Sequence, residues 1–61
     1  MDEFRYILSE ENIPWEIGPG HARRMTNDEI LSDEDRMRKL TFILSGAIDI
    51  TKEEAERRAG N

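Results

Sequence analysis

Histidine is the side chain that ordinarily changes charge near neutral pH, and this sequence contains one, His21. Nucleophilic catalysis would also need a positioned Ser, Thr or Cys and an acid that orients the histidine. The sequence has no cysteine and no recognisable nucleophile elbow or triad. His21 lies instead after a Gly-Pro-Gly segment and beside Arg23 and Arg24, which indicates a surface or structural role. We therefore expect that the protein is not an enzyme.

The 14 Asp and Glu residues could support two other kinds of chemistry, calcium binding and catalysis by carboxylates. An EF-hand loop needs glycine at its sixth position and glutamate at its twelfth. Counted from Asp33, these positions hold Arg38 and Leu44, so the pattern fails. The absence of cysteine and the single histidine also leave no thiolate site and no nitrogen-rich site for a metal. We expect neither a metal nor a cofactor, and no pair of carboxylates stands out for acid and base work.

Several basic residues could contact the phosphates of a nucleic acid. The net charge of −5 disfavours general attraction to nucleic acid, although a local patch can overcome a net charge. Acids such as Asp28 and Glu29 follow closely and are able to neutralise part of the patch. Nucleic-acid binding, or transcription regulation through this patch, is therefore the alternative function. Its candidate residues are Arg23, Arg24, Arg36, Arg38 and Lys39.

Three segments match the capping box, in which a helix begins at a hydroxyl residue and carries an acid three residues later. They begin at Thr26, Ser32 and Thr51. Acids in the first turn also suit the positive end of the helix dipole, which explains much of the acidity. We predict a helix that starts after Thr26, a central helix over 33–45 that ends at Gly46, and a last helix over 52–59.

The rest of the chain yields one more predicted helix and one irregular segment. Phe4, Ile7 and Leu8 have the spacing of one helical face, which predicts a helix over 2–11. The 12–25 segment contains both prolines and two glycines, so it is expected to be an irregular loop. Within it Trp15 should cover the core, with Ile17 pointing to the same side.

These elements predict an all-α fold, a small bundle of three to four short helices with an irregular loop at about 12–25. The 61 residues are expected to form a single domain. The 47–50 segment alternates apolar and polar residues, as an extended link does, but no strand is predicted to pair with it. A domain this small has a marginal core unless a disulfide, a metal or a partner adds stability. Association is the supplement that this composition leaves open.

The central helix is apolar on more than one side. Met37, Leu40 and Leu44 form one stripe, and Phe42 lies too far around the helix to share it. Burial from two directions suggests that a second molecule covers one of them. The leading prediction is a small acidic regulator or inhibitor that binds a protein partner, with a homodimer as one form of that partnership. The candidate contact residues are Trp15, Phe42, Ile43 and Met37.

The composition also bears on location. No apolar run exceeds three residues, as at 42–44, which is far shorter than the roughly 20 that a membrane span needs. Asp2 and Glu3 stand where a secretory leader would carry basic residues. A cytoplasmic protein without contact to a membrane is expected.

Overall fold

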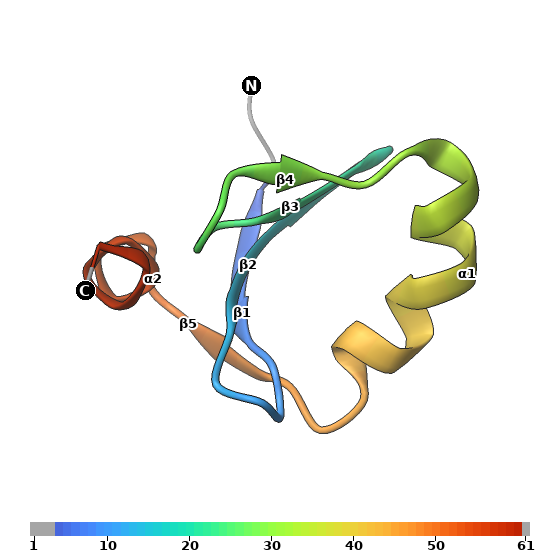
Figure 1. Ribbon diagram of the computed structural model, residues 1–61. Coiled ribbons are helices and arrows are strands. Elements are labelled where there is room, and N and C mark those ends of the chain that lie inside the picture. The colour runs from blue at the N-terminus through green and yellow to red at the C-terminus, as the bar shows by residue number, and fades with distance from the viewer. Residues whose placement is uncertain (1–3, 61) are drawn as a thin grey trace.

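The computed structural model describes residues 4–60 and contains a five-stranded antiparallel sheet with a helix on each face (Figure 1). Along the sheet the strands lie in the order β4-β3-β2-β1-β5. The prediction of an all-α bundle is therefore wrong. The elements are β1 (Arg5–Leu8), β2 (Pro14–Gly18), β3 (His21–Arg24), β4 (Glu29–Ile30), α1 (Asp33–Leu44), β5 (Ile48–Ile50) and α2 (Lys52–Ala59).

The prediction of a helix over 2–11 is wrong for the residues of this range that the structure describes, because residues 5–8 form strand β1. Asp2 and Glu3 lie outside the described residues. The spacing of Phe4, Ile7 and Leu8 spans little more than one turn, too short a run to separate a helix from a buried strand. Aromatic and β-branched side chains such as Tyr6 and Ile7 favour strands. In the sheet Ile7 faces one layer and Leu8 the other, and both are buried.

The segment predicted to be an irregular loop instead contains β2 and β3, which pair as a hairpin. Pro14 begins β2, where a proline is tolerated, and its carbonyl accepts a hydrogen bond from the Met25 N–H at 3.0 Å. Between β2 and β3, Pro19 and Gly20 form a tight turn in which Gly20 has φ +64°. The expectation that Trp15 and Ile17 share a side is confirmed, since both are buried in one cluster on the same strand.

The prediction of a helix that starts after Thr26 is also wrong, because this segment forms a turn and strand β4. Asn27 accepts a hydrogen bond from the Glu29 N–H at 3.0 Å, and Asp28 has φ +58°. Asn and Asp satisfy nearby backbone groups in turns as readily as at helix starts. The 25–28 segment therefore turns the chain from β3 into β4, which pairs with β3 through Ile30 and Glu29.

The two later helices are confirmed. Ser32 and Thr51 accept hydrogen bonds from the N–H groups of Asp35 and Glu54, as the capping boxes predict. After α1, Gly46 takes the left-handed conformation with φ +75°. The extended link predicted at 47–50 becomes β5, and its partner is β1, the segment that the sequence pattern assigned to a helix.

The core lies between the sheet and α1. Its buried residues are Ile7, Trp15, Ile17, Ala22 and Leu31, and α1 adds the partly buried Leu40, Ile43 and Leu44. On the other face α2 packs against β1 and β2 with its fully buried Ala55 (Figure 1). Within residues 4–60, neither helix is long and apolar enough to cross a membrane.

Candidate functional site

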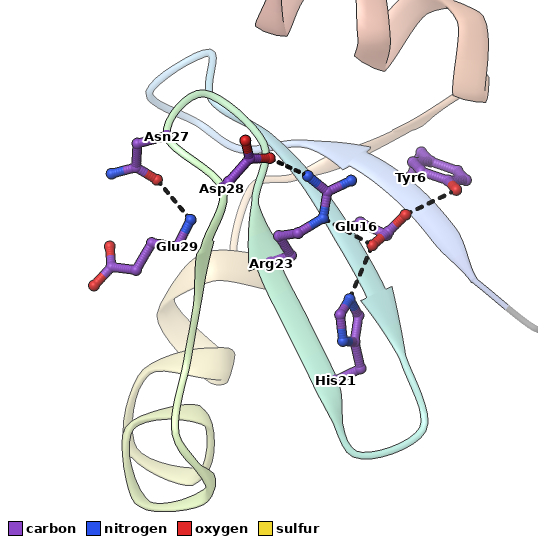
Figure 2. A network of polar contacts seen from close by, with 7 residues as sticks. All are labelled: Tyr6, Glu16, His21, Arg23, Asn27, Asp28 and Glu29. Atoms are coloured by element: carbon purple, nitrogen blue, oxygen red, sulfur yellow. Dashed lines mark hydrogen bonds and ion pairs between the residues drawn. The ribbon is translucent and has the colours of Figure 1, made fainter.

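A network of polar side chains centres on Glu16 in the middle strand of the sheet (Figure 2). Its carboxylate accepts hydrogen bonds from the hydroxyl of Tyr6 on β1 at 3.1 Å and from Nε of Arg23 on β3 at 3.0 Å. Nε2 of His21 lies 2.9 Å from the same carboxylate. Arg23 also forms an ion pair with Asp28 in the turn after β3. The network therefore ties three neighbouring strands together.

The electrostatics of this network fit a structural role. The hydrogen bond from Arg23 is the main reason that the pKa of Glu16 falls from 4.5 to about 2, against the opposing effect of burial. Burial, followed by the hydrogen bond to Glu16, raises the pKa of Tyr6. A carboxylate with so low a pKa is a poor general base, and a phenol with a raised pKa is a poor nucleophile at neutral pH.

His21 belongs to this network and also packs against an aromatic ring. Its ring centre lies 4.9 Å from that of Phe4. Phe4 in turn covers Gly18, where an added Cβ would stand 2.3 Å from a ring carbon. The surroundings of His21 thus include the carboxylate of Glu16, the ring of Phe4 and the turn between β2 and β3.

A cleft of about 320 Å³ opens on the other face of the sheet, between the sheet and the C-terminal half of α1. The β1–β2 turn contributes Glu11 and Ile13, and the strands contribute Trp15 and Arg24. The helix contributes Lys39, Phe42 and Ile43. A volume of this size lies at the lower end of the range for ligand pockets in proteins.

The apolar side chains of the cleft differ sharply in their exposure. Trp15 is 7% exposed and belongs to the core, whereas Phe42 is 80% exposed. Lys39, Phe42 and Ile43 share one side of α1 because residues three and four apart are neighbours on a helix. The sheet therefore supplies a fixed aromatic floor, and α1 places a large apolar side chain at the rim with most of its surface in water.

The cations of the cleft stand out by their lack of ion pairs. The chain has 9 Lys and Arg residues, of which six arginines pair with carboxylates. Within residues 4–60, the three basic residues with no ion pair are Arg24, Lys39 and Lys52. Arg24 and Lys39 both line the cleft. Arg24 uses its Nε to donate to the Thr26 hydroxyl at 3.2 Å.

The structure brings together most of the partner-binding residues expected from the sequence. Trp15, Phe42 and Ile43 line the cleft, whereas Met37 is 80% exposed on α1 outside it. Sequence reasoning missed Glu11 and Ile13, which lie in the turn before β2. An apolar residue directly before a proline was the available signal for Ile13, because such a residue tends to be extended.

The basic patch expected from the sequence is not assembled. Arg23 lies in the Glu16 network, while Arg36 pairs with Asp33 and donates to the carbonyl of Gly20 at 3.3 Å. Arg38 pairs with Glu34 one turn earlier on the same helix. Arg24 and Lys39 remain together at the cleft.

In the described part of the chain, no three His, Asp or Glu side chains gather in a way that could hold a metal ion. No protein-family model matches the sequence, and no curated protein or solved structure matches it either. The function is therefore inferred from the geometry of the cleft.

Proposed function

We propose that this protein is a small binding module that regulates or inhibits a partner protein by holding a segment of it in the cleft between the sheet and α1. The observation that carries the proposal is the pair formed by Phe42 and Trp15. An exposed aromatic side chain at the rim and a buried one at the floor are typical of the few residues that dominate a protein interface.

The size of the cleft favours a different chain as the partner over a second copy. The cleft is small, so it suits a few side chains of an inserted segment rather than a broad flat surface. We propose that the partner is cytoplasmic, which agrees with the absence of cysteine in this chain.

The ion pairs weigh against the alternative of nucleic-acid binding. Three of the arginines that would contact phosphates already face carboxylates within the chain: Arg23, Arg36 and Arg38. Each would have to leave its acid before it could neutralise a phosphate, which reduces the gain from counterion release. Protein binding is therefore the function that the site supports best.

The test is affinity capture from the native cell with three forms of the protein: wild type, Phe42→Ala and Ile48→Ala. Ile48 is the matched control, because it is also an exposed large apolar side chain, at 58%, but lies on β5 away from the cleft. The captured protein is then purified and titrated against each form. We expect Phe42→Ala to weaken binding at least about tenfold, equivalent to about 1.4 kcal/mol, and Ile48→Ala to leave it unchanged. Equal affinity of all three forms would rule out the cleft.

A further inference from the structure

Resting on the proposed function, we infer that the cleft recognises an acidic apolar segment, in which a large aliphatic or aromatic side chain is flanked by carboxylates. The apolar side chain enters between Trp15 and Phe42, and the carboxylates meet Arg24 and Lys39.

The charge of Arg24 is the first argument. Every other arginine in residues 4–60 has a carboxylate partner, in a chain with 14 acids. Within the described residues, Arg24 has one side-chain partner, the Thr26 hydroxyl, which accepts a hydrogen bond from its Nε. A guanidinium can hold a carboxylate through two parallel hydrogen bonds, so an arginine that lacks an acid is well suited to one from outside.

The position of Arg24 is the second argument. In the register of the sheet Arg24 lies directly opposite Trp15, and both line the cleft. The backbone of the hairpin thus fixes the cation beside the apolar floor. A ligand side chain that packs on Trp15 brings the flanking residues of the ligand close to Arg24. A carboxylate on one of these residues gains a charged hydrogen bond in a partly dry site.

Lys39 adds a second cation from the helix, and Glu11 adds one acid from the β1–β2 turn. The Glu11 carboxylate accepts from the Ser9 hydroxyl at 3.4 Å, so it is partly engaged within its own turn. The lining therefore carries one more positive than negative charge. An acidic segment meets two attractive groups and one repulsive group, and a basic segment meets the reverse.

The net charge of −5 does not cancel this local preference. At physiological salt the Debye length is about 8 Å, so acids farther than this from the cleft are largely screened from it. The groups that line the cleft decide which charge is favoured there. Selectivity for an acidic segment should therefore persist at physiological ionic strength.

The experiment uses Trp15, the only tryptophan of the chain, as a fluorescent reporter inside the cleft. Three short peptides share one Phe-Leu anchor and differ only in the flanking residues, which are Glu, Gln or Lys. We expect the Glu peptide to bind at least about tenfold more tightly than the Lys peptide, with the Gln peptide between them. Arg24→Gln and Lys39→Gln should each reduce this difference, while Lys52→Gln serves as the control and should leave it intact.

Four results obtained with added peptide or oligonucleotide would overturn the inference. They are equal binding of the three peptides, tighter binding of the Lys peptide, no change of Trp15 fluorescence with any peptide, and tighter binding of a single-stranded oligonucleotide than of the Glu peptide. A change of Trp15 fluorescence with protein concentration alone, matched by dimers in light scattering, would assign the cleft to a second copy and also overturn it. The proposed function is decided separately, because the Phe42 dependence of the captured partner does not require an acidic segment.

Discussion

Arg24 lies directly opposite Trp15 in the ladder between β2 and β3. The arginine without a carboxylate partner in residues 4–60 therefore stands beside the only tryptophan of the chain. This relationship places one positive charge and one large apolar surface at the same cleft. It separates Arg24 from its sequence neighbour Arg23, which points to the other face of the sheet and joins the Glu16 network.

The exposure of Phe42 predicts that it contributes little to folding. Phe42→Ala should change the free energy of unfolding by less than about 1 kcal/mol, because the side chain is 80% exposed. Leu31→Ala should cost about 2–5 kcal/mol, since Leu31 is buried in the core. Urea unfolding followed by Trp15 fluorescence measures both. A loss for Phe42→Ala as large as that for Leu31→Ala would show that Phe42 belongs to the core and not to a binding surface.

The low pKa of Glu16 predicts a loss of stability in acid. The folded pKa of about 2 lies below the ordinary value of 4.5, so the unfolded chain takes up the proton first as the pH falls. The contribution of Glu16 is complete above about pH 5 and is lost between there and about pH 2, with a total of about 3 kcal/mol. Wild type should therefore show a steeper decrease over this range than Glu16→Gln, in urea unfolding at a series of pH values.

Glu29→Gln is the matched control for this pH dependence, because Glu29 is an exposed glutamate in β4, the strand at the edge of the same sheet. Its stability curve should run parallel to that of wild type. If the Glu16→Gln curve also runs parallel to wild type, the carboxylate of Glu16 is not held by Arg23 as described.

The contact between Gly18 and Phe4 predicts that the effect of Gly18→Ala on stability depends on whether residue 4 is Phe or Ala. An added Cβ at Gly18 would stand 2.3 Å from a ring carbon of Phe4, so Gly18→Ala must displace that ring and should cost about 1 kcal/mol. In the Phe4→Ala background the same change should be neutral or stabilising, since glycine weakens a strand. Thermal unfolding of the two single variants and the double variant gives the coupling energy. A coupling near zero would contradict the close packing of Phe4 on Gly18.

The side chains that cap the two helices predict similar losses of stability when either is removed. Ser32→Ala and Thr51→Ala each remove a side chain that accepts a hydrogen bond from the first turn of α1 or α2. Each should lower the stability by about 1 kcal/mol in thermal unfolding. Thr26→Ala is the control, because Thr26 stands in the same sequence pattern but lies in a turn and not at the start of a helix. An equal loss at Thr26 would require another explanation than helix capping.

Both helices that fold as such were predictable because their signals are local. Ser32 and Thr51 mark the first turns, and Gly46 marks the end of α1. The sheet was not predictable in this way. Strand β1 has too few residues to show its period, and one of its two partners, β5, lies far along the chain. The pattern at Thr26 suited both a turn and a helix start, and pairing with β3 selected the turn.

The candidate site was predictable in part. Phe42 could be separated from the apolar stripe of its helix by angle alone, and Trp15 by its size and its place between prolines. The sequence could not place Arg24 with them, because strand register decides which of two adjacent arginines reaches a given face. The sequence also could not predict that Met37 is exposed, because this depends on α1 packing on the sheet through Leu40, Ile43 and Leu44.

Chemical-shift mapping with the captured partner locates the binding surface residue by residue. The backbone amides of the ¹⁵N-labelled protein are recorded before and after addition of the purified partner. We predict that the largest changes fall on the residues that line the cleft: Glu11, Ile13, Trp15, Arg24, Lys39, Phe42 and Ile43. Changes confined to β5 and α2, with Trp15 and Phe42 unaffected, would contradict the assignment of the cleft as the binding site.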